Sequence, residues 1–238
     1  MIKKDIIIIT IVSKGEIYDE IVKWYWNPMI AYCNKNYPQI KIFLLYNNYP
    51  EYLNVNPDNL INLNKEETYI PGILDKTISA FQFINENYQY QSVIRTNVSS
   101  FLILKQIIEI SKELHQKKGY LYAGKRNIAM YKRIHYISGA LFWINKRTLE
   151  FILNNQKHLN KSLIDDLSIG ELITTNPDIK MNFLKRCDAL CNLQENKKIP
   201  GIIKRILNQN HFHLRIKSKE RKRDIVKFKV LTTFFYNS

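Results

Sequence analysis

Continuous apolar runs along this chain alternate with segments of helical spacing. Residues 5–12 (DIIIITIV) form an unbroken apolar run, and residues 40–47 and 92–96 form two further short runs. Runs of this length predict strands that are buried on both faces, as in the centre of a parallel sheet. Residues 50–64 are rich in Asn and Pro, which predicts a loop.

Helical periodicity fills the intervals between these runs. Apolar residues recur every three or four positions in 16–36, which predicts one long helix. A second helix is expected to start near Pro71, because proline is favoured in a first turn. Residues 100–116 have an amphipathic pattern, and Ser99 or Ser100 is the expected N-cap of that helix.

The second half of the chain continues the alternation. Residues 119–125 predict a fourth strand, and residues 138–155 predict a strand or buried turn followed by a helix. Residues 162–176 read as a loop entering a helix, with Asp165 or Asp166 near its N-terminus. This order predicts a doubly wound α/β fold with a mostly parallel sheet and one topological switch point.

The net charge of +15 indicates the kind of partner that the protein binds. Such an excess favours an anionic partner: nucleic acid, an anionic membrane that would attract the protein peripherally, or a phosphorylated ligand. The basic residues concentrate in 197–205 (KKIPGIIKR) and 213–229 (HLRIKSKERKRDIVKFK). A solvated helix is one interpretation of this tail, but the aromatic and histidine residues of HFHLR argue against a purely solvated face.

Several common sites are not indicated. There is no GxGxxG after the first strand and no GxxxxGK[ST], so neither a dinucleotide fold nor a P-loop is predicted. The three cysteines do not form a disulfide framework or a zinc pattern. The first apolar run is short and lacks a cleavage site, and no run approaches the roughly 20 residues of a membrane span. We therefore expect a cytoplasmic protein.

Small polar residues end the third strand, in the stretch VIRTNVSSF of 93–101. In open α/β sheets the carboxyl ends of the strands hold the ligand. Three segments then appear in a fixed order: 66–77 (EETYIPGILDKT) with 93–101, 135–152 (HYISGALFWINKRTLEFI), and 164–173 (IDDLSIGELI).

Together these segments resemble GT-A-fold glycosyltransferases of the β-1,3-galactosyltransferase/Fringe group. In that group an acidic-x-Tyr stretch precedes a Leu-Thr-Leu-Lys-Thr helix, and a strand ending Lys-Thr-Asp-Asp-Asp-Val-Phe follows. Tyr-x-Ser-Gly-Gly and Glu-Asp-Val-x-x-Gly come next. The corresponding residues here are Tyr69, Lys76 and Thr77, then 95–101, 136–140 and 165–170. The resemblance covers about half of the chain.

The resemblance implies a single glycosyltransferase domain over 1–238. Residues 1–105 would bind the nucleotide sugar, 106–200 would form the acceptor and catalytic half, and the basic tail 201–238 would close on the diphosphate. It further implies donor-binding roles for residues at the first strand end, in the second helix and third strand, and in the Ser-Gly segment: Thr10, Val12, Ser13, Lys76, Arg95, Ser138 and Gly139. Lys76 and Arg95 have an ordinary ion pair as the alternative interpretation.

The departure from the family falls on its metal motif. Where the family has Asp-x-Asp, which holds a divalent metal on the diphosphate, this chain has Asn97-Val98-Ser99. Mg²⁺ and Mn²⁺ prefer carboxylates, so Asn97 and Ser99 would be poor ligands. They remain suited to hydrogen bonds with a ribose or sugar hydroxyl, or to capping the next helix. We expect no required cofactor and at most weak binding of Mn²⁺ or Mg²⁺.

Protein cations would then neutralise the leaving diphosphate. An extended HLRIK segment would place His213, Arg215 and Lys217 on one face, where they could clamp phosphate oxygens. A basic surface helix is the alternative. Asp166 matches the Asp of the family's Glu-Asp-Val and is the candidate base, although a carboxylate at a helix N-terminus also serves as a cap.

The leading prediction is therefore an inverting glycosyltransferase that moves a sugar from a nucleotide sugar, with UDP-sugar favoured, to a glycan acceptor hydroxyl. Two alternatives stay open. One is a basic nucleic-acid-binding protein, although no RRM, KH or helix-turn-helix pattern indicates a specific nucleic acid. The other is a catalytically inactive GT-A scaffold that acts as a binding module.

Overall fold

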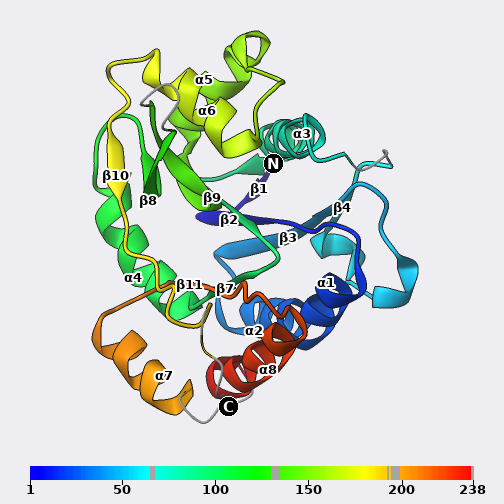
Figure 1. Cartoon of the computed structure of the whole chain (residues 1–238). Coiled ribbons are helices and arrows are strands. Elements are labelled where there is room, and N and C mark those ends of the chain that lie inside the picture. Colours follow the sequence, from blue (N-terminus) through cyan, green and yellow to red (C-terminus); the bar gives the residue numbers. More distant parts are fainter. Residues whose placement is uncertain (65–67, 130–133, 192, 194–198, 237–238) are drawn as a thin grey trace.

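The computed structural model describes residues 1–64, 68–129, 134–191, 193 and 199–236, and its centre is a seven-stranded sheet (Figure 1). The strand order across this sheet is β10-β8-β9-β6-β2-β3-β4. The strands are β2 (Ile6–Ile11), β3 (Ile40–Tyr46), β4 (Leu60–Asn62), β6 (Ser92–Asn97), β8 (Tyr122–Ala129), β9 (Ile134–Asn145) and β10 (Met181–Phe183). The two short strands β1 (Ile2–Lys3) and β5 (Tyr88–Gln89) pair separately.

The central strand β2 shows why the sheet is covered on both faces. All six of its residues are buried. Ile6 and Ile8 belong to the hydrophobic cluster on one face, and Ile7 and Ile9 belong to the cluster on the other. Because successive strand residues point to opposite faces, an unbroken isoleucine run requires helices on both sides. The prediction of a doubly buried strand is confirmed.

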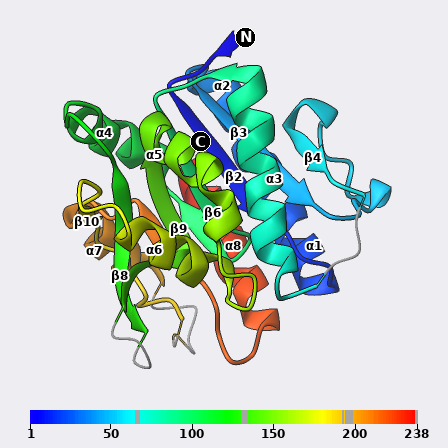
Figure 2. The same cartoon turned by 90° about the horizontal axis from the view of Figure 1, so that it is seen from above.

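The helices divide between the two faces accordingly, as Figures 1 and 2 show. One face packs against α3 (Gly72–Asn87), α5 (Lys146–Asn154) and α6 (Asp165–Thr174). The other packs against α1 (Glu16–Ile21), α2 (Asn27–Asn36), α4 (Leu104–His115), α7 (Ile199–Asn208) and α8 (Lys222–Tyr236). A π-helical segment, Val22–Trp26, joins α1 to α2, so the predicted helix over 16–36 is continuous.

The direction in which successive strands are added to the sheet changes at β2. This strand pairs in parallel with β3 on one side and with β6 on the other. Beyond β6 the strand β9 runs antiparallel, both to β6 and to β8. The mostly parallel α/β class is thus confirmed, and the switch point lies at the carboxyl ends of β2 and β6, where ligands bind in such sheets.

The expected N-cap of the third predicted helix is wrong. Ser100 begins a short strand, β7 (Ser100–Leu102), and α4 starts at Leu104 after Ile103, without a side-chain cap. The strand β7 pairs antiparallel with β11 (His213–Arg215). Ser100 does not cap α4 because its pairing with β11 holds this segment extended. Its hydroxyl instead donates to the carbonyl of Ala140 at 2.9 Å.

The segment predicted as a loop over 50–64 also contains regular structure. Two 3₁₀ turns, Glu51–Leu53 and Pro57–Asn59, precede the edge strand β4. The side chain of Asn59 is buried and donates to the carbonyl of Ile42 at 2.7 Å, which holds this segment against β3. The polar composition of residues 50–64 therefore did not indicate the three-residue edge strand β4.

The basic tail is part of the core rather than a loose extension. Phe228 and Tyr236 of α8 are buried, and the ring centroid of Phe228 lies 5.0 Å from that of Tyr25. Tyr25 in turn stacks on Phe101 at 4.4 Å. The aromatic contacts fix the tail beneath β7, so that β11 has a defined register. No helix within the described ranges has the length and apolar character needed to cross a bilayer.

Candidate active site

A pocket of about 460 Å³ lies at the carboxyl ends of β2 and β6. Most of the predicted donor-binding and catalytic residues line it. They are Ser13, Arg95, Asn97, Ser99, Ser138, Gly139, Asp166, Arg215 and Lys217. The acidic residues Glu66 and Glu67 of the motif around Tyr69 lie outside the described residues, whereas Tyr69 itself lines the pocket.

Three predicted residues lie behind the pocket wall. Thr10 and Val12 are fully buried in and just after β2. The ammonium of Lys76, also buried, donates to the carbonyl of Val12 at 2.7 Å. Lys76 thus holds the chain where it leaves the strand, and the structure does not bring it into the pocket.

His213 is also placed outside the pocket. It is buried, and its Nε2 lies 3.0 Å from the hydroxyl of Ser100. Burial, together with the charges of Arg186 and Arg215, holds the pKa of His213 well below its usual range. The imidazole is therefore neutral at physiological pH and carries no charge for a diphosphate. The extended conformation of residues 213–215 is as predicted, but only Arg215 reaches the pocket from it.

Arg95 forms a buried ion pair with Asp165 and also donates to the carbonyl of Gly139. Thr77 adds a hydrogen bond to the same Asp165 carboxylate at 3.2 Å. These contacts join β6, β9, α3 and α6 at the pocket wall, which Arg95, Gly139 and Asp165 line. A buried ion pair with several hydrogen bonds fixes geometry more than it adds stability, so we assign Arg95 and Asp165 a positioning role.

Asp166 lines the pocket from the first turn of α6, and its predicted place near the N-terminus of a helix is confirmed. Its Oδ2 accepts from the amide of Gly139 at 2.6 Å, and its Oδ1 accepts from the amide of Leu167 at 3.0 Å. Burial raises the pKa of Asp166, and the charge of Asp165 raises it further. The hydrogen bonds from Gly139 and Leu167 and the charge of Arg95 oppose this shift.

Gly139 lies so close to Asp166 that only a hydrogen fits between them. A Cβ built at position 139 would lie 2.9 Å from Cβ, Cγ and Oδ2 of Asp166. Gly139→Ala is therefore expected to displace the carboxylate, destabilise the fold by about 1–3 kcal/mol and abolish most activity. Thermal unfolding and turnover measure the two effects. Gly201→Ala is the matched control, since a Cβ there meets nothing within 4 Å; equal behaviour of the two variants would contradict the prediction.

The strand end at Asn97 is organised around its amide oxygen. That oxygen accepts from Arg215, from Ser100 at 3.3 Å and from Ser99 at 3.5 Å. A divalent cation would need carboxylates here, and it would compete with an arginine for the same oxygen. No cluster of three or more His, Cys, Asp or Glu side chains suited to a metal occurs in the part of the chain that the structure describes. These donors do not fit the divalent metal that the sequence resemblance implies at this position.

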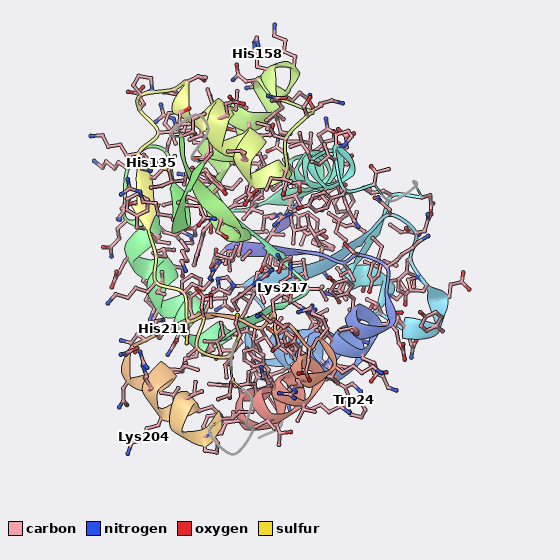
Figure 3. All side chains as sticks on the ribbon, in the orientation of Figure 1. Trp24, His135, His158, Lys204, His211 and Lys217 are labelled. Atoms are coloured by element: carbon pink, nitrogen blue, oxygen red, sulfur yellow. The ribbon has the colours of Figure 1, made fainter. Side chains whose placement is uncertain are left out.

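Besides Arg95, three cations line the pocket: Arg186, Arg215 and Lys217. Burial and the charge of Arg186 lower the pKa of Arg215 to about 10. Partial burial and the charge of Arg215 likewise lower the pKa of Lys217. Like charges are thus crowded together, and a bound anion would relieve their repulsion. In Figure 3 the label of Lys217 marks this part of the molecule.

Arg186 is the main residue that the sequence patterns did not indicate. Its guanidinium binds Asp188 through two contacts, of 2.7 and 3.1 Å, and donates to the hydroxyl of Ser138 at 3.1 Å. No motif surrounds it. Its position depends on a bridge between Cys187 and Leu214 of β11, which only the folded chain forms. Tyr18 of α1 also lines the pocket unpredicted.

The fold is that of the GT-A glycosyltransferases. The structure is similar to a glycosyltransferase involved in the glycosylation of the major capsid of PBCV-1, with a TM-score of 0.59 and 10% identity over 95% of this chain and 99% of that chain. The galactosyltransferase LgtC, solved with donor and acceptor sugar analogs, gives a TM-score of 0.46 and 10% identity, with 95% of each chain covered. A Drosophila β-1,4-galactosyltransferase 7 mutant in complex with manganese, UDP-Gal and xylobiose gives a TM-score of 0.44 and 10% identity, covering 75% of this chain and 64% of that chain.

No protein-family model matches the sequence. No curated protein matches it either. The likeness to solved structures therefore concerns the fold, and the resemblance to the Fringe group stays a prediction from sequence motifs.

Proposed function

We propose that this chain is a glycosyltransferase that takes its sugar from a nucleoside diphosphate sugar. The observation that carries the proposal is that one pocket is lined both by the cations Arg186, Arg215 and Lys217 and by the Asp166 carboxylate. Glycosyl transfer needs positive charge at the leaving diphosphate and a base at the acceptor hydroxyl. The pocket lies at the switch point, where this fold class binds ligands.

The cations take the place of a divalent metal in this proposal. Among the described residues no ion pair engages Arg215 or Lys217, and both side chains line the pocket, where we propose that they contact phosphate oxygens. Arginine suits this task because its planar guanidinium binds two oxygens of one phosphate. Asn97 holds the Arg215 guanidinium through a neutral oxygen, which orients it without cancelling its charge.

Asp166 is the proposed catalytic base. It removes the proton from the acceptor hydroxyl as that oxygen attacks the anomeric carbon, while the bond from that carbon to the diphosphate oxygen breaks. The nucleoside diphosphate leaves with the bonding electrons, and the attack from the opposite side inverts the anomeric configuration. Burial and Asp165 make this carboxylate a stronger base than an exposed one. We propose a glycan hydroxyl as the acceptor and a UDP-sugar as the donor, following the sequence resemblance.

A thermal-shift series tests the donor proposal. UDP and UDP-sugars are expected to raise the unfolding temperature through mass action, with and without Mn²⁺, and equally in the presence of EDTA. Stabilisation that EDTA abolishes would reject the metal-independent mode. Binding without turnover over a panel of glycan acceptors would favour the inactive scaffold, and salt-sensitive binding to DNA without a nucleotide-sugar effect would favour the nucleic-acid alternative.

Activity is expected to fall as pH drops through the raised pKa of Asp166, because only the carboxylate accepts a proton. Asp165→Asn removes one cause of that raised pKa and frees Arg95, and both changes lower it. The acidic limb of the kcat/KM profile should therefore move to lower pH. Asp75→Asn, which removes a carboxylate from an exposed pair with Lys161, should leave the limb in place. An unchanged or upward-shifted limb in Asp165→Asn would contradict Asp166 as base.

A further inference from the structure

The outer sides of α7 and α8 carry exposed apolar residues that the core does not use. Leu207 is 41% exposed, Val230 is 37% exposed and Phe234 is 52% exposed. A groove of about 720 Å³ runs between the two helices. Its lining is almost entirely apolar and consists of Pro200, Ile203, Lys204, Leu207, Val230, Thr233 and Phe234. A contiguous apolar surface of this kind indicates an interaction site.

The sequence of α8 places this surface on one side of the helix. Lys222, Val226, Val230 and Phe234 follow one another at intervals of four residues, so they share one face. The opposite face carries Phe228, which is fully buried against the sheet. The helix α8 therefore has one apolar face that packs on the core. It has a second apolar stripe that faces solvent and is bordered by lysine. We call this stripe, together with Lys204 and Leu207 of α7, the α7–α8 surface.

Trp24 extends the α7–α8 surface at its far edge. Trp24 is 39% exposed, and the ammonium groups of Lys229 and Lys23 lie 3.9 and 5.4 Å from its ring centroid. The indole N–H donates to Glu20 at 2.8 Å. In Figure 3, Trp24 and Lys204 lie at the same end of the molecule, away from His158. A half-exposed tryptophan beside lysines is typical of a membrane–water interface.

The charge of the α7–α8 surface distinguishes among the partners that could bind there. Residues 199–236 contain ten Lys and Arg and two acidic residues. Arg215 and Lys217 line the pocket and Lys227 is buried, whereas Lys204, Lys222 and Lys229 lie on the two helices that form the surface. Of the two acids, Glu220 is paired with Arg223 at 2.7 Å, and Asp224 is buried in a pair with Arg221. A second copy of the chain would oppose this cationic surface with itself across a two-fold axis. Nucleic acid would leave the aliphatic and aromatic side chains in water.

We propose that the α7–α8 surface docks on an anionic lipid bilayer. The helix α8 lies in the interface plane, with Val230 and Phe234 at the boundary of headgroups and acyl chains. Lys204 and Lys222 reach the lipid phosphates while their aliphatic stems cover apolar surface. Binding to the bilayer requires both the apolar and the electrostatic contribution, because a few apolar side chains or a few cations alone give only weak binding. This docking is independent of the proposed enzymatic function.

Vesicle sedimentation with the full chain tests the proposal. The protein is expected to sediment with vesicles of equimolar phosphatidylcholine and phosphatidylglycerol at low salt, and much less with phosphatidylcholine alone or at high salt. Phe234→Ser should lower the partition coefficient about tenfold. Phe183→Ser is the matched control, since Phe183 is 55% exposed on β10, and it should sediment like the wild type. Lys204→Glu should weaken binding, whereas Lys157→Glu, on the 3₁₀ turn Gln156–His158, should not.

Tryptophan fluorescence gives a second readout on the folded protein. Trp26 and Trp143 are fully buried, so a blue shift on vesicle binding reports Trp24. Trp24→Phe should lose the shift while it still sediments. The proposal is overturned if anionic vesicles do not sediment the protein, or if Phe234→Ser and Phe183→Ser behave alike. It is also overturned if sedimentation velocity shows a dimer that Phe234→Ser dissociates, because the surface then belongs to a second copy.

Discussion

Replacing Asp166 with Asn is expected to lower kcat by about 10²- to 10⁴-fold, the usual contribution of a general base, and to leave donor affinity nearly unchanged. Asparagine keeps the size of the side chain and can still accept one of the two backbone hydrogen bonds, from Gly139 or Leu167. It cannot take the acceptor proton. Turnover of a UDP-sugar and binding of UDP by calorimetry separate the two effects.

Glu171→Gln supplies the control for Asp166→Asn. Glu171 belongs to the same helix, α6, and its side chain does not line the pocket. Removing its charge should leave kcat within about twofold of the wild type, as is usual for a site away from the chemistry. Wild-type turnover in Asp166→Asn would remove this residue from the mechanism. Retention of anomeric configuration in the product, seen by NMR, would reject in-line attack assisted by this base.

Replacing Arg215 with Gln is expected to weaken UDP binding by about 10- to 100-fold, because a hydrogen bond to a charged group contributes about 1.5–3 kcal/mol. Arg215 is half-buried, and burial together with the charge of Arg186 lowers its pKa to about 10. Loss of its contact with Asn97 also frees that amide. Affinity measured by calorimetry, in EDTA and again with Mn²⁺, gives the size of the effect.

Two further variants separate the effect of the Arg215 contact from the effect of net charge. Arg215→Lys keeps the charge but loses the two-pronged contact, so its affinity should lie between those of the wild type and Arg215→Gln. Arg126→Gln removes an exposed arginine of β8 that stacks on Phe183 and is not among the residues that line the pocket, and this variant should bind UDP like the wild type. Equal loss in Arg126→Gln would show that only net charge matters. Wild-type affinity in Arg215→Gln would exclude the clamp.

Local pattern was sufficient for the framework of the fold. The isoleucine run of β2 and the apolar run of β3 predicted strands buried on both faces, and both are central strands of the sheet. The aspartates at positions 165 and 166 were placed at a helix start, which the structure confirms. Such features depend on the burial of neighbouring residues, which a periodicity records directly.

Local pattern failed where a distant segment competed with it. Ser100 has the composition of an N-cap, yet it lies in β7 because β11 pairs with it. His213 sits in a cationic stretch, yet that pairing buries it against Ser100 and burial keeps it neutral. The energy of a long-range strand pair and of aromatic packing under α8 outweighs the preference of one serine for a helix end.

The pocket itself required the same long-range contacts. Arg215 binds Asn97 across 118 positions of sequence, and Arg186 reaches Ser138 across 48. By itself, the sequence determined the α/β layering, the polar strand end at Asn97 and Ser99 without carboxylates, and the cationic tail. Only the tertiary structure decided which cations stand beside that strand end. Spacing along a chain records which face a residue takes, whereas the meeting of distant segments depends on strand register and packing.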